Sequence, residues 1–191
     1  MAHLSILGTG NMGQAIASVA VKGGHTVQLL GENDHDTSVT GDIVVLAVPY
    51  PAVADVIAQR GESLAGKIVV DITNPLNFET FDSLTVSADG SAAAEIAAAL
   101  PASKVLKAFN TNFAATLASG TVGGQATTVL IAGDDADAKA LLAGVITTGG
   151  LRAVDAGALS RARELEAIGF LQLTLAAGEK IAWTGGFGVV A

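Results

Sequence analysis

The chain alternates short apolar runs with longer segments of helical character. The short runs predict strands, because a run of four to eight apolar residues suits a strand that is covered on both faces. The predicted strands are residues 4–7, 26–30, 43–48, 67–72, 104–109, 127–131 and 152–155. The predicted helices are residues 11–22, 51–60, 91–100, 134–147 and 160–182.

Residues at the ends of these segments support the assignment. Pro51 suits a first helical turn, where its missing N–H costs no hydrogen bond. Ser91 and Ser160 are good N-caps, and Gly23-Gly24 is a typical end for the first helix. The repeated strand–helix order predicts an α/β fold of the Rossmann type, in which a doubly wound parallel sheet is followed by a C-terminal helical segment. Between the second and third strands, residues 31–42 are predicted to form only a short polar loop.

Composition and charge exclude several classes of protein. The chain is 50% apolar and 15% charged, which excludes intrinsic disorder. A net charge of −8 without a basic stripe disfavours binding to nucleic acid and to anionic membranes. With no cysteine and three scattered histidines, neither a thiolate nucleophile nor a metal site is expected. We see no signal peptide and no membrane-spanning stretch, and expect a soluble, cytoplasmic protein.

A glycine-rich segment, Gly8-Thr9-Gly10-Asn11-Met12-Gly13, joins the first predicted strand to the first predicted helix. Gly8 permits a tight turn, Gly10 leaves room for a pyrophosphate against the backbone, and Gly13 lets the helix approach the sheet. The helix N-terminus offers free N–H groups and the positive end of a dipole to phosphates. The segment therefore predicts a dinucleotide-binding site. The alternative is a glycine turn with a structural role only.

The residues after the second strand normally select the dinucleotide. An acidic residue there binds the ribose 2′-OH of NAD, whereas an arginine accommodates the 2′-phosphate of NADP. Here Gly31 is followed by Glu32 and Asn33, and residues 23–59 contain no lysine or arginine. Glu32 could hold a ribose diol or be a solvated loop charge. Thr9, Asn33 and His35 could donate hydrogen bonds to a 2′-phosphate. Both NAD and NADP remain candidates.

Polar residues or prolines also end three further predicted strands, at the edge where α/β sheets bind ligands. These ends carry the candidate site residues Ala47, Val48, Pro49, Asn74, Pro75, Lys107 and Asn110. Asn and Pro are turn residues as well, so ordinary turn chemistry is the alternative. A lysine within an apolar strand requires a specific partner or a function.

Together these motifs resemble the family of coenzyme F420-dependent NADP oxidoreductases. The matching stretches are residues 8–13, 47–49, 66–76, 107–111, 132–135, 155–157 and 162–166, in the order in which the family has them. The resemblance implies a nicotinamide cofactor on the glycine loop, with Ala47, Val48, Pro49 and Asn74 beside its ribose and nicotinamide. It also implies hydride transfer to a flat acceptor, such as a deazaflavin or flavin, near Gly185 and Gly186, with Lys107 and Asn110 as further acceptor-side candidates.

The chain departs from the family at two places. Gly31-Glu32 stands where the family usually carries Ser-Arg, and the short 31–42 segment removes part of the adenosine wall. These departures affect the choice between NADP and NAD rather than dinucleotide binding itself.

From these observations we predict an NAD(P)-dependent oxidoreductase with a small-molecule substrate. No strong general acid is visible, which favours hydride exchange between two rings over carbonyl reduction. The alternatives are a dinucleotide-sensing module without catalysis and, less favoured, a methyltransferase. Residues 1–159 would bind the dinucleotide, and residues 160–191 would pack on them within one compact domain. The apolar surface of residues 162–183 predicts a homodimer.

Overall fold

The computed structural model describes residues 1–190, so Ala191, the last residue of the predicted C-terminal segment, lies outside the described residues. The strands are β1 His3–Leu7, β2 Thr26–Leu30, β3 Ile43–Leu46, β4 Ile68–Asp71, β5 Lys104–Lys107, β6 Thr121–Val122, β7 Gln125–Ala126, β8 Thr128–Gly133 and β9 Arg152–Gly157. The α-helices are α1 Asn11–Lys22, α2 Val53–Leu64, α3 Ala92–Ala99, α4 Ala114–Ser119, α5 Ala136–Thr148 and α6 Ala162–Ala177. Short 3-10 turns, η1 Tyr50–Ala52 and η2 Leu159–Arg161, precede α2 and α6.

Seven strands form one sheet in the order β2-β1-β3-β4-β5-β8-β9. Every neighbouring pair is parallel except β5 and β8, which are antiparallel. The predicted Rossmann-type sheet is thus confirmed, and it contains one antiparallel pair that the sequence did not indicate. The chain leaves β5 through the six-residue helix α4 and a β6–β7 hairpin, and it enters β8 from the carboxyl edge of β5. Since that path needs no crossover, β8 runs in the opposite direction.

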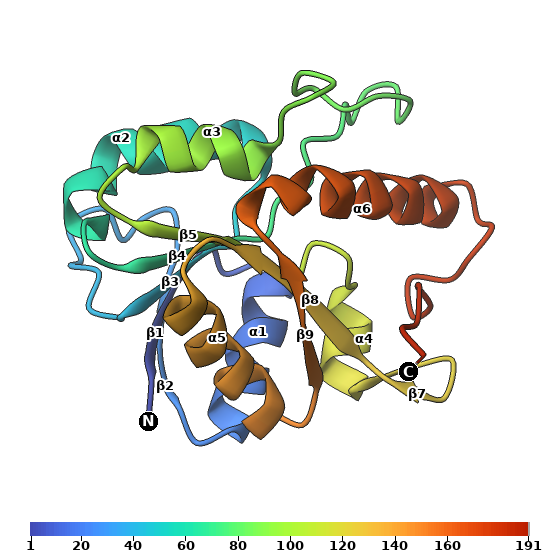
Figure 1. Ribbon diagram of the computed structural model, residues 1–191, viewed down its shortest axis with the longest axis horizontal. Helices are drawn as coiled ribbons and strands as arrows, with labels where there is room; N and C mark the ends of the chain where they lie inside the picture. The colour runs from blue at the N-terminus through green and yellow to red at the C-terminus, as the bar shows by residue number, and fades with distance from the viewer. Residues whose placement is uncertain (191) are drawn as a thin grey trace.

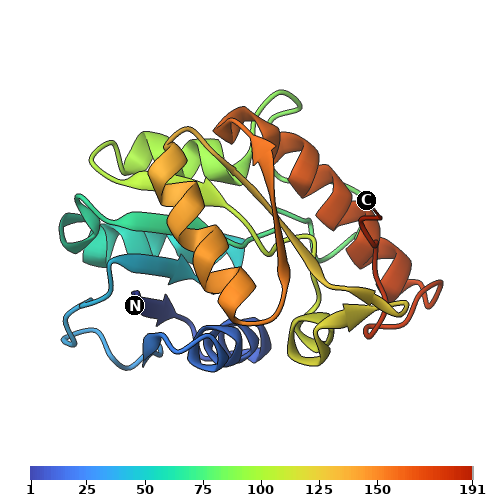
Figure 2. The same cartoon turned by 60° about the horizontal axis from the view of Figure 1, so that its bottom comes forward.

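Helices cover both faces of this sheet (Figures 1 and 2). α1, α4 and α5 lie on one face, and α2, α3 and α6 lie on the other. The strands contribute side chains to two separate hydrophobic cores, one on each face of the sheet. In β3, Ile43 and Val45 belong to one core, whereas Val44 and Leu46 belong to the other. Both faces are therefore apolar, which explains why the strands appear in the sequence as continuous apolar runs.

The helix boundaries confirm some predictions and correct others. α1 spans the predicted residues with Gly23 as its C-cap, and the Ser91 side chain caps α3 by accepting a bond from the Ala94 amide at 3.1 Å. Ser160 was wrongly predicted as a cap, because it lies inside η2 and α6 begins at Ala162. α6 ends at Ala177 rather than at residue 182, since Gly178 closes it. Helix α4 and the β6–β7 hairpin were not predicted.

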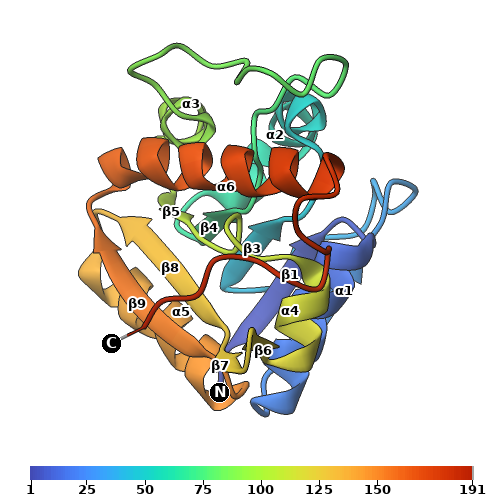
Figure 3. The ribbon, with the colours of Figure 1, turned by 90° about the vertical axis from the view of Figure 1, so that its right-hand side faces the viewer.

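The segment after α6 turns back over the molecule toward α4 and β7 (Figure 3). The Phe187 amide donates to Gln172 Oε1 at 3.0 Å, and Arg152 donates to the Val189 carbonyl at 3.0 Å. These bonds tie the C-terminal segment to α6 and β9. Within residues 1–190, no helix has both the length and the apolar character needed to cross a membrane.

Candidate functional site

The three glycines of the loop between β1 and α1 have different surroundings. A Cβ on Gly8 would lie 2.2 Å from the Ala47 carbonyl oxygen, and one on Gly13 would lie 2.1 Å from the Gly8 carbonyl oxygen. Gly8 also has a φ of +120°, which side chains disfavour. A Cβ on Gly10, by contrast, would meet nothing within 4 Å. The fold itself requires Gly8 and Gly13, whereas Gly10 borders open space.

That open space lies at the N-terminus of α1. Gly10 is the N-cap, it makes no side-chain capping bond, and the first turn contains no acidic residue. The first amides of a helix have no partner within the helix, and the dipole makes that end electropositive. The arrangement suits a phosphate group at Gly10.

One cavity opens on the β2 side of this point. This β2-side cavity, of about 560 Å³, lies between the glycine loop, the end of β2, the turn after β3 and one face of α2. Seven of the predicted cofactor-binding residues line it: Gly8, Thr9, Gly10, Glu32, Ala47, Val48 and Pro49. His35, Asp55 and Arg60 add charged or titratable groups to the same wall. The β2-side cavity is therefore continuous with the glycine loop.

A second cavity, of about 390 Å³, opens on the other side of the α1 N-terminus and reaches toward α6. This α6-side cavity lies at the carboxyl ends of β4 and β5. Four predicted residues line it: Asn11, Met12, Asn74 and Asn110. Phe109, Phe113 and Trp183 give it an aromatic character. The two cavities flank the same helix end, as the two halves of a dinucleotide require.

Two asparagines are fixed at the edge of the α6-side cavity. Asn74 Nδ2 donates to the Asn110 carbonyl at 2.9 Å, and Asn110 Nδ2 donates to Asn74 Oδ1 at 3.0 Å and to the Leu165 carbonyl at 2.8 Å. Helix α6 comes this close only because residue 169 is glycine: a Cβ there would lie 2.2 Å from Asn74 Oδ1. The pair thus joins two strand ends to α6.

Unpartnered polar atoms also mark the α6-side cavity. The side-chain oxygens of Asn110 and Asn112 are buried and have no hydrogen-bond partner within the described structure. Buried polar groups are normally satisfied, so these oxygens are available to a ligand N–H. Phe109, between β5 and Asn110, has a φ of +62°. Such backbone strain is concentrated at functional sites.

Lys107 has a different position from the one that its sequence context suggested. Its side chain is fully buried, with Nζ 2.8 Å from Asp71 Oδ2, 2.8 Å from Glu166 Oε1 and 2.6 Å from the Thr73 carbonyl. Glu166 in turn accepts a bond from the Ala92 amide at 2.9 Å, at the start of α3. Burial raises the pKa of Glu166, and Lys107 opposes that shift. Lys107 lines neither cavity and holds β4, β5, α3 and α6 together.

Five other predicted residues also line neither cavity, and one of them is Gly13, which packs against the Gly8 carbonyl. Asn33 is exposed on the loop after β2, and Pro75 is buried with its carbonyl bonded to Thr85. Gly185 and Gly186 lie beyond Trp183, and a Cβ on Gly186 would approach Gln172 Oε1 to 3.0 Å. Among the described residues after α6, Trp183 lines the α6-side cavity, and its ring centroid lies 5.0 Å from that of Phe113.

Sequence reasoning also missed Arg60, Asn112 and Trp183. Asn112 stands two residues after Asn110 in the same polar strand end, and this repetition was an available signal. Arg60 belongs to α2, far along the chain from Gly31, and only the tertiary structure brings it to the β2-side cavity. Among residues 1–190, no cluster of His, Asp or Glu is suited to hold a metal ion.

Comparison with known proteins agrees with this geometry. The family model described as NADP oxidoreductase, coenzyme F420-dependent, matches residues 30–75. The F420-dependent NADP reductase of Methanocaldococcus jannaschii is 33% identical over 149 residues, which are 76% of this chain and 66% of that protein. The metalloreductase STEAP3 of Rattus norvegicus is 29% identical over 180 residues, which are 86% of this chain but only 36% of that protein.

A solved structure extends the agreement over the whole fold. The crystal structure of a candidate F420-dependent NADP-reductase from Arthrobacter sp. FB24 has a TM-score of 0.85 and 26% identity, and the alignment covers 98% of this chain and 99% of that one. The likeness includes the C-terminal part as well as the dinucleotide-binding sheet. From the sequence matches, the shared fold and the glycine loop together, the chain belongs to the oxidoreductase family of coenzyme F420-dependent NADP oxidoreductases.

Proposed function

We propose that this chain transfers hydride between NADP(H) and a planar acceptor of the deazaflavin or flavin type. The observation that carries the proposal is the open space at Gly10, at an uncapped helix end between two cavities. The adenosine half would occupy the β2-side cavity, and the pyrophosphate would lie on the first amides of α1. When bound, the nicotinamide supplies the hydride from its C4 atom.

The residues of the α6-side cavity fit a reaction between two rings. Phe109, Phe113 and Trp183 offer flat apolar surfaces, and the free oxygens of Asn110 and Asn112 can accept bonds from a carboxamide or a ring N–H. No residue that lines this cavity, within the described part of the chain, carries a titratable side chain. Carbonyl reduction needs a proton donor, whereas hydride exchange between rings does not. The residues here would position the rings and exclude water.

The positions of these residues suggest separate roles for the two parts of the chain. Residues 1–159 would bind the dinucleotide, while the C-terminal part would complete the acceptor wall through Trp183 and fix Asn74 and Asn110 through α6. We also propose that a second copy of the chain packs against α6, where Leu171 is 50% exposed. Light scattering that returns the mass of a single chain at micromolar concentration would contradict the dimer.

Dinucleotide binding is tested by calorimetric titration of the purified protein with NADPH and NADH, followed by the variant Gly10→Val. Because Gly10 borders open space, the variant should fold with an unchanged Tm but lose binding, since its side chain occupies the place of the pyrophosphate. Gly144→Val is the matched control, because a Cβ on Gly144 in α5 also meets nothing within 4 Å. Unchanged NADPH affinity in Gly10→Val would contradict the proposal.

Catalysis is tested separately by following NADPH oxidation with coenzyme F420 and with a flavin as acceptors. Turnover with at least one of them is expected. Tight NADPH binding without turnover by any planar acceptor would instead identify a dinucleotide-sensing module.

A further inference from the structure

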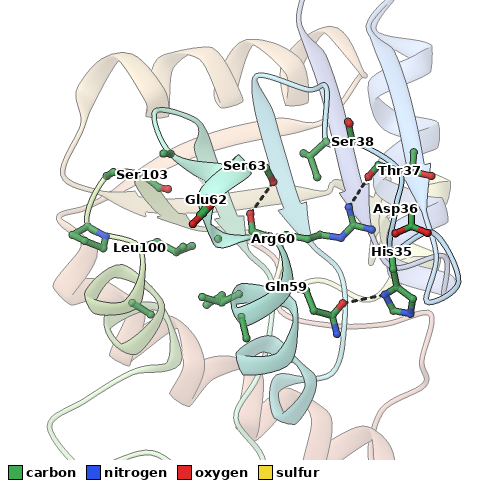
Figure 4. A pocket seen from close by; sticks show the side chains of 18 residues that line it. His35, Asp36, Thr37, Ser38, Gln59, Arg60, Glu62, Ser63, Leu100 and Ser103 are labelled. Carbon is green, nitrogen blue, oxygen red and sulfur yellow. Dashed lines mark hydrogen bonds between the residues drawn. The ribbon is translucent and has the colours of Figure 1, made fainter.

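Arg60 connects α2 to the loop that follows β2 (Figure 4). Its guanidinium donates to the carbonyl of Thr37 at 2.7 Å and to the carbonyl of Asp34. Arg60 also lines the β2-side cavity, together with Gly31 and Glu32. The short 31–42 segment contains no helix, so the loop after β2 faces α2 directly. An α2 side chain thereby reaches the end of β2, where the adenosine ribose binds in this fold.

The charges around the β2-side cavity make Arg60 distinctive. Among its described lining residues, Arg60 is the sole lysine or arginine, and His35 is the other potential cation. Glu32 and Asp55 contribute carboxylates to the same wall. Asp34, in the same loop, accepts the Gly31 amide through its Oδ2 at 2.7 Å and so places a further carboxylate at the end of β2. Among the described residues of this wall, Arg60 is therefore the one permanent positive charge that an anionic group of a ligand could pair with.

The guanidinium retains unused donors. An arginine side chain carries five N–H groups, and the bonds to the Thr37 and Asp34 carbonyls use two of them. Those two bonds hold the planar group in place before any ligand arrives, so binding costs little side-chain entropy. A guanidinium fixed in this way is well suited to a phosphate, which it can contact through two parallel bonds.

We propose that Arg60 selects NADP over NAD by binding the 2′-phosphate of the adenosine. This rests on the proposed function and specifies how the β2-side cavity chooses its dinucleotide. The cation that the loop after β2 lacks would come from the opposite wall, out of α2. Glu32 predicts the reverse preference, because a carboxylate beside the ribose accepts bonds from a diol and repels a phosphate. Arg60 therefore favours NADP, whereas Glu32 favours NAD, and the two effects can be measured separately.

The test uses two nucleotide probes that differ only in the group at issue, adenosine 2′,5′-bisphosphate and adenosine 5′-monophosphate, titrated by calorimetry. Wild-type protein should bind the bisphosphate at least about 10-fold more tightly, as charge-assisted bonds to a phosphate imply. Arg60→Gln should weaken the affinity for the bisphosphate by about 10- to 100-fold and change the affinity for the monophosphate by no more than about twofold. Arg152→Gln is the matched control, since Arg152 also donates to a backbone carbonyl but lies on β9.

Two further variants keep the test decisive if Arg60→Gln folds poorly. Arg60→Lys retains the charge and should retain part of the bisphosphate preference. Glu32→Gln, at an exposed position, should strengthen bisphosphate binding by a few-fold because it removes a repelling charge.

The outcomes separate the two proposals. Equal wild-type affinity for both probes, or an equal loss of both in Arg60→Gln, would overturn the role of Arg60 and leave it as a support for the loop. If NADPH and NADH also fail to bind the wild-type protein, the proposed function itself fails.

Discussion

Replacing Lys107 by methionine would test whether the buried ion cluster maintains the fold. Methionine has similar length but no charge, so Asp71 and Glu166 would face each other without the cation that lies 2.8 Å from each. Breaking a buried pair by removing one partner costs about 3–5 kcal/mol, because the remaining charge stays in the interior. A domain of this size loses about 2–4 °C of Tm for each kcal/mol, so Tm should fall by roughly 6–20 °C.

The same strand provides the control. Lys104 starts β5 and pairs with Asp135 at 2.9 Å, but its side chain is 47% exposed. Exposed pairs contribute little, so Lys104→Met should change Tm only slightly, and by less at high salt. Differential scanning calorimetry of both variants, at low and at high salt, makes the comparison.

The pH dependence of the Lys107→Met variant adds an independent signature. Burial raises the pKa of Glu166, and removing Lys107 raises it further. A carboxyl group with a raised folded pKa contributes stability below its unfolded pKa, about 4.3, and loses it as the pH rises through the folded pKa. The variant should therefore be closest to wild type near about pH 4 and weakest near neutrality. Equal Tm losses in Lys104→Met and Lys107→Met, or a deficit independent of pH, would refute this account of the cluster.

Three other predictions concern local structure. Gly13→Ala should destabilise the protein by about 1–3 kcal/mol in urea unfolding, because its Cβ would lie 2.1 Å from the Gly8 carbonyl oxygen, while Gly10→Ala should not. Ser91→Ala should cost about 1 kcal/mol in the same assay through loss of the α3 cap, and Ser91→Thr, which keeps the hydroxyl, should lose less. The hydrogen bond from the Ala138 amide lowers the pKa of Asp135 below its usual value, and the hydrogen bond from Lys104 adds to this effect. The advantage of wild type over Asp135→Asn should accordingly be present above about pH 3.9 and vanish as the pH falls through the folded pKa.

Local sequence patterns were sufficient to predict the strands and the helix that position the glycine loop. The first helix was predicted to the residue, because Gly10 and Gly23 mark its two ends and its small residues face the sheet. The buried strands were recognisable because both of their faces are covered. The direction of β8 was not predictable, since an apolar run looks the same in either direction. α4 was missed because six residues between Phe113 and Gly120 give too little pattern.

The candidate site was harder to predict where it depends on distant residues. The glycine loop and the strand ends were recognisable because each is contiguous in sequence. Arg60 faces the loop after β2 only because residues 31–42 are too short to place a helix between them. Lys107 was noticed as an anomaly, but its partners Asp71 and Glu166 lie 36 and 59 positions away, and nothing local indicates them.

Glu166 has a consequence for how the molecule can move. Its carboxylate belongs to α6, yet it neutralises a lysine of β5 and closes the N-terminus of α3. Swinging α6 outward, as a hinged cap would do, would leave Lys107 with one carboxylate, that of Asp71, and would take the acceptor away from the Ala92 and Ala93 amides. An open state with α6 displaced would therefore be high in free energy. We expect ligands to enter and leave through small side-chain rotations at the edge of the α6-side cavity, where Trp183 is half exposed, while α6 stays in place.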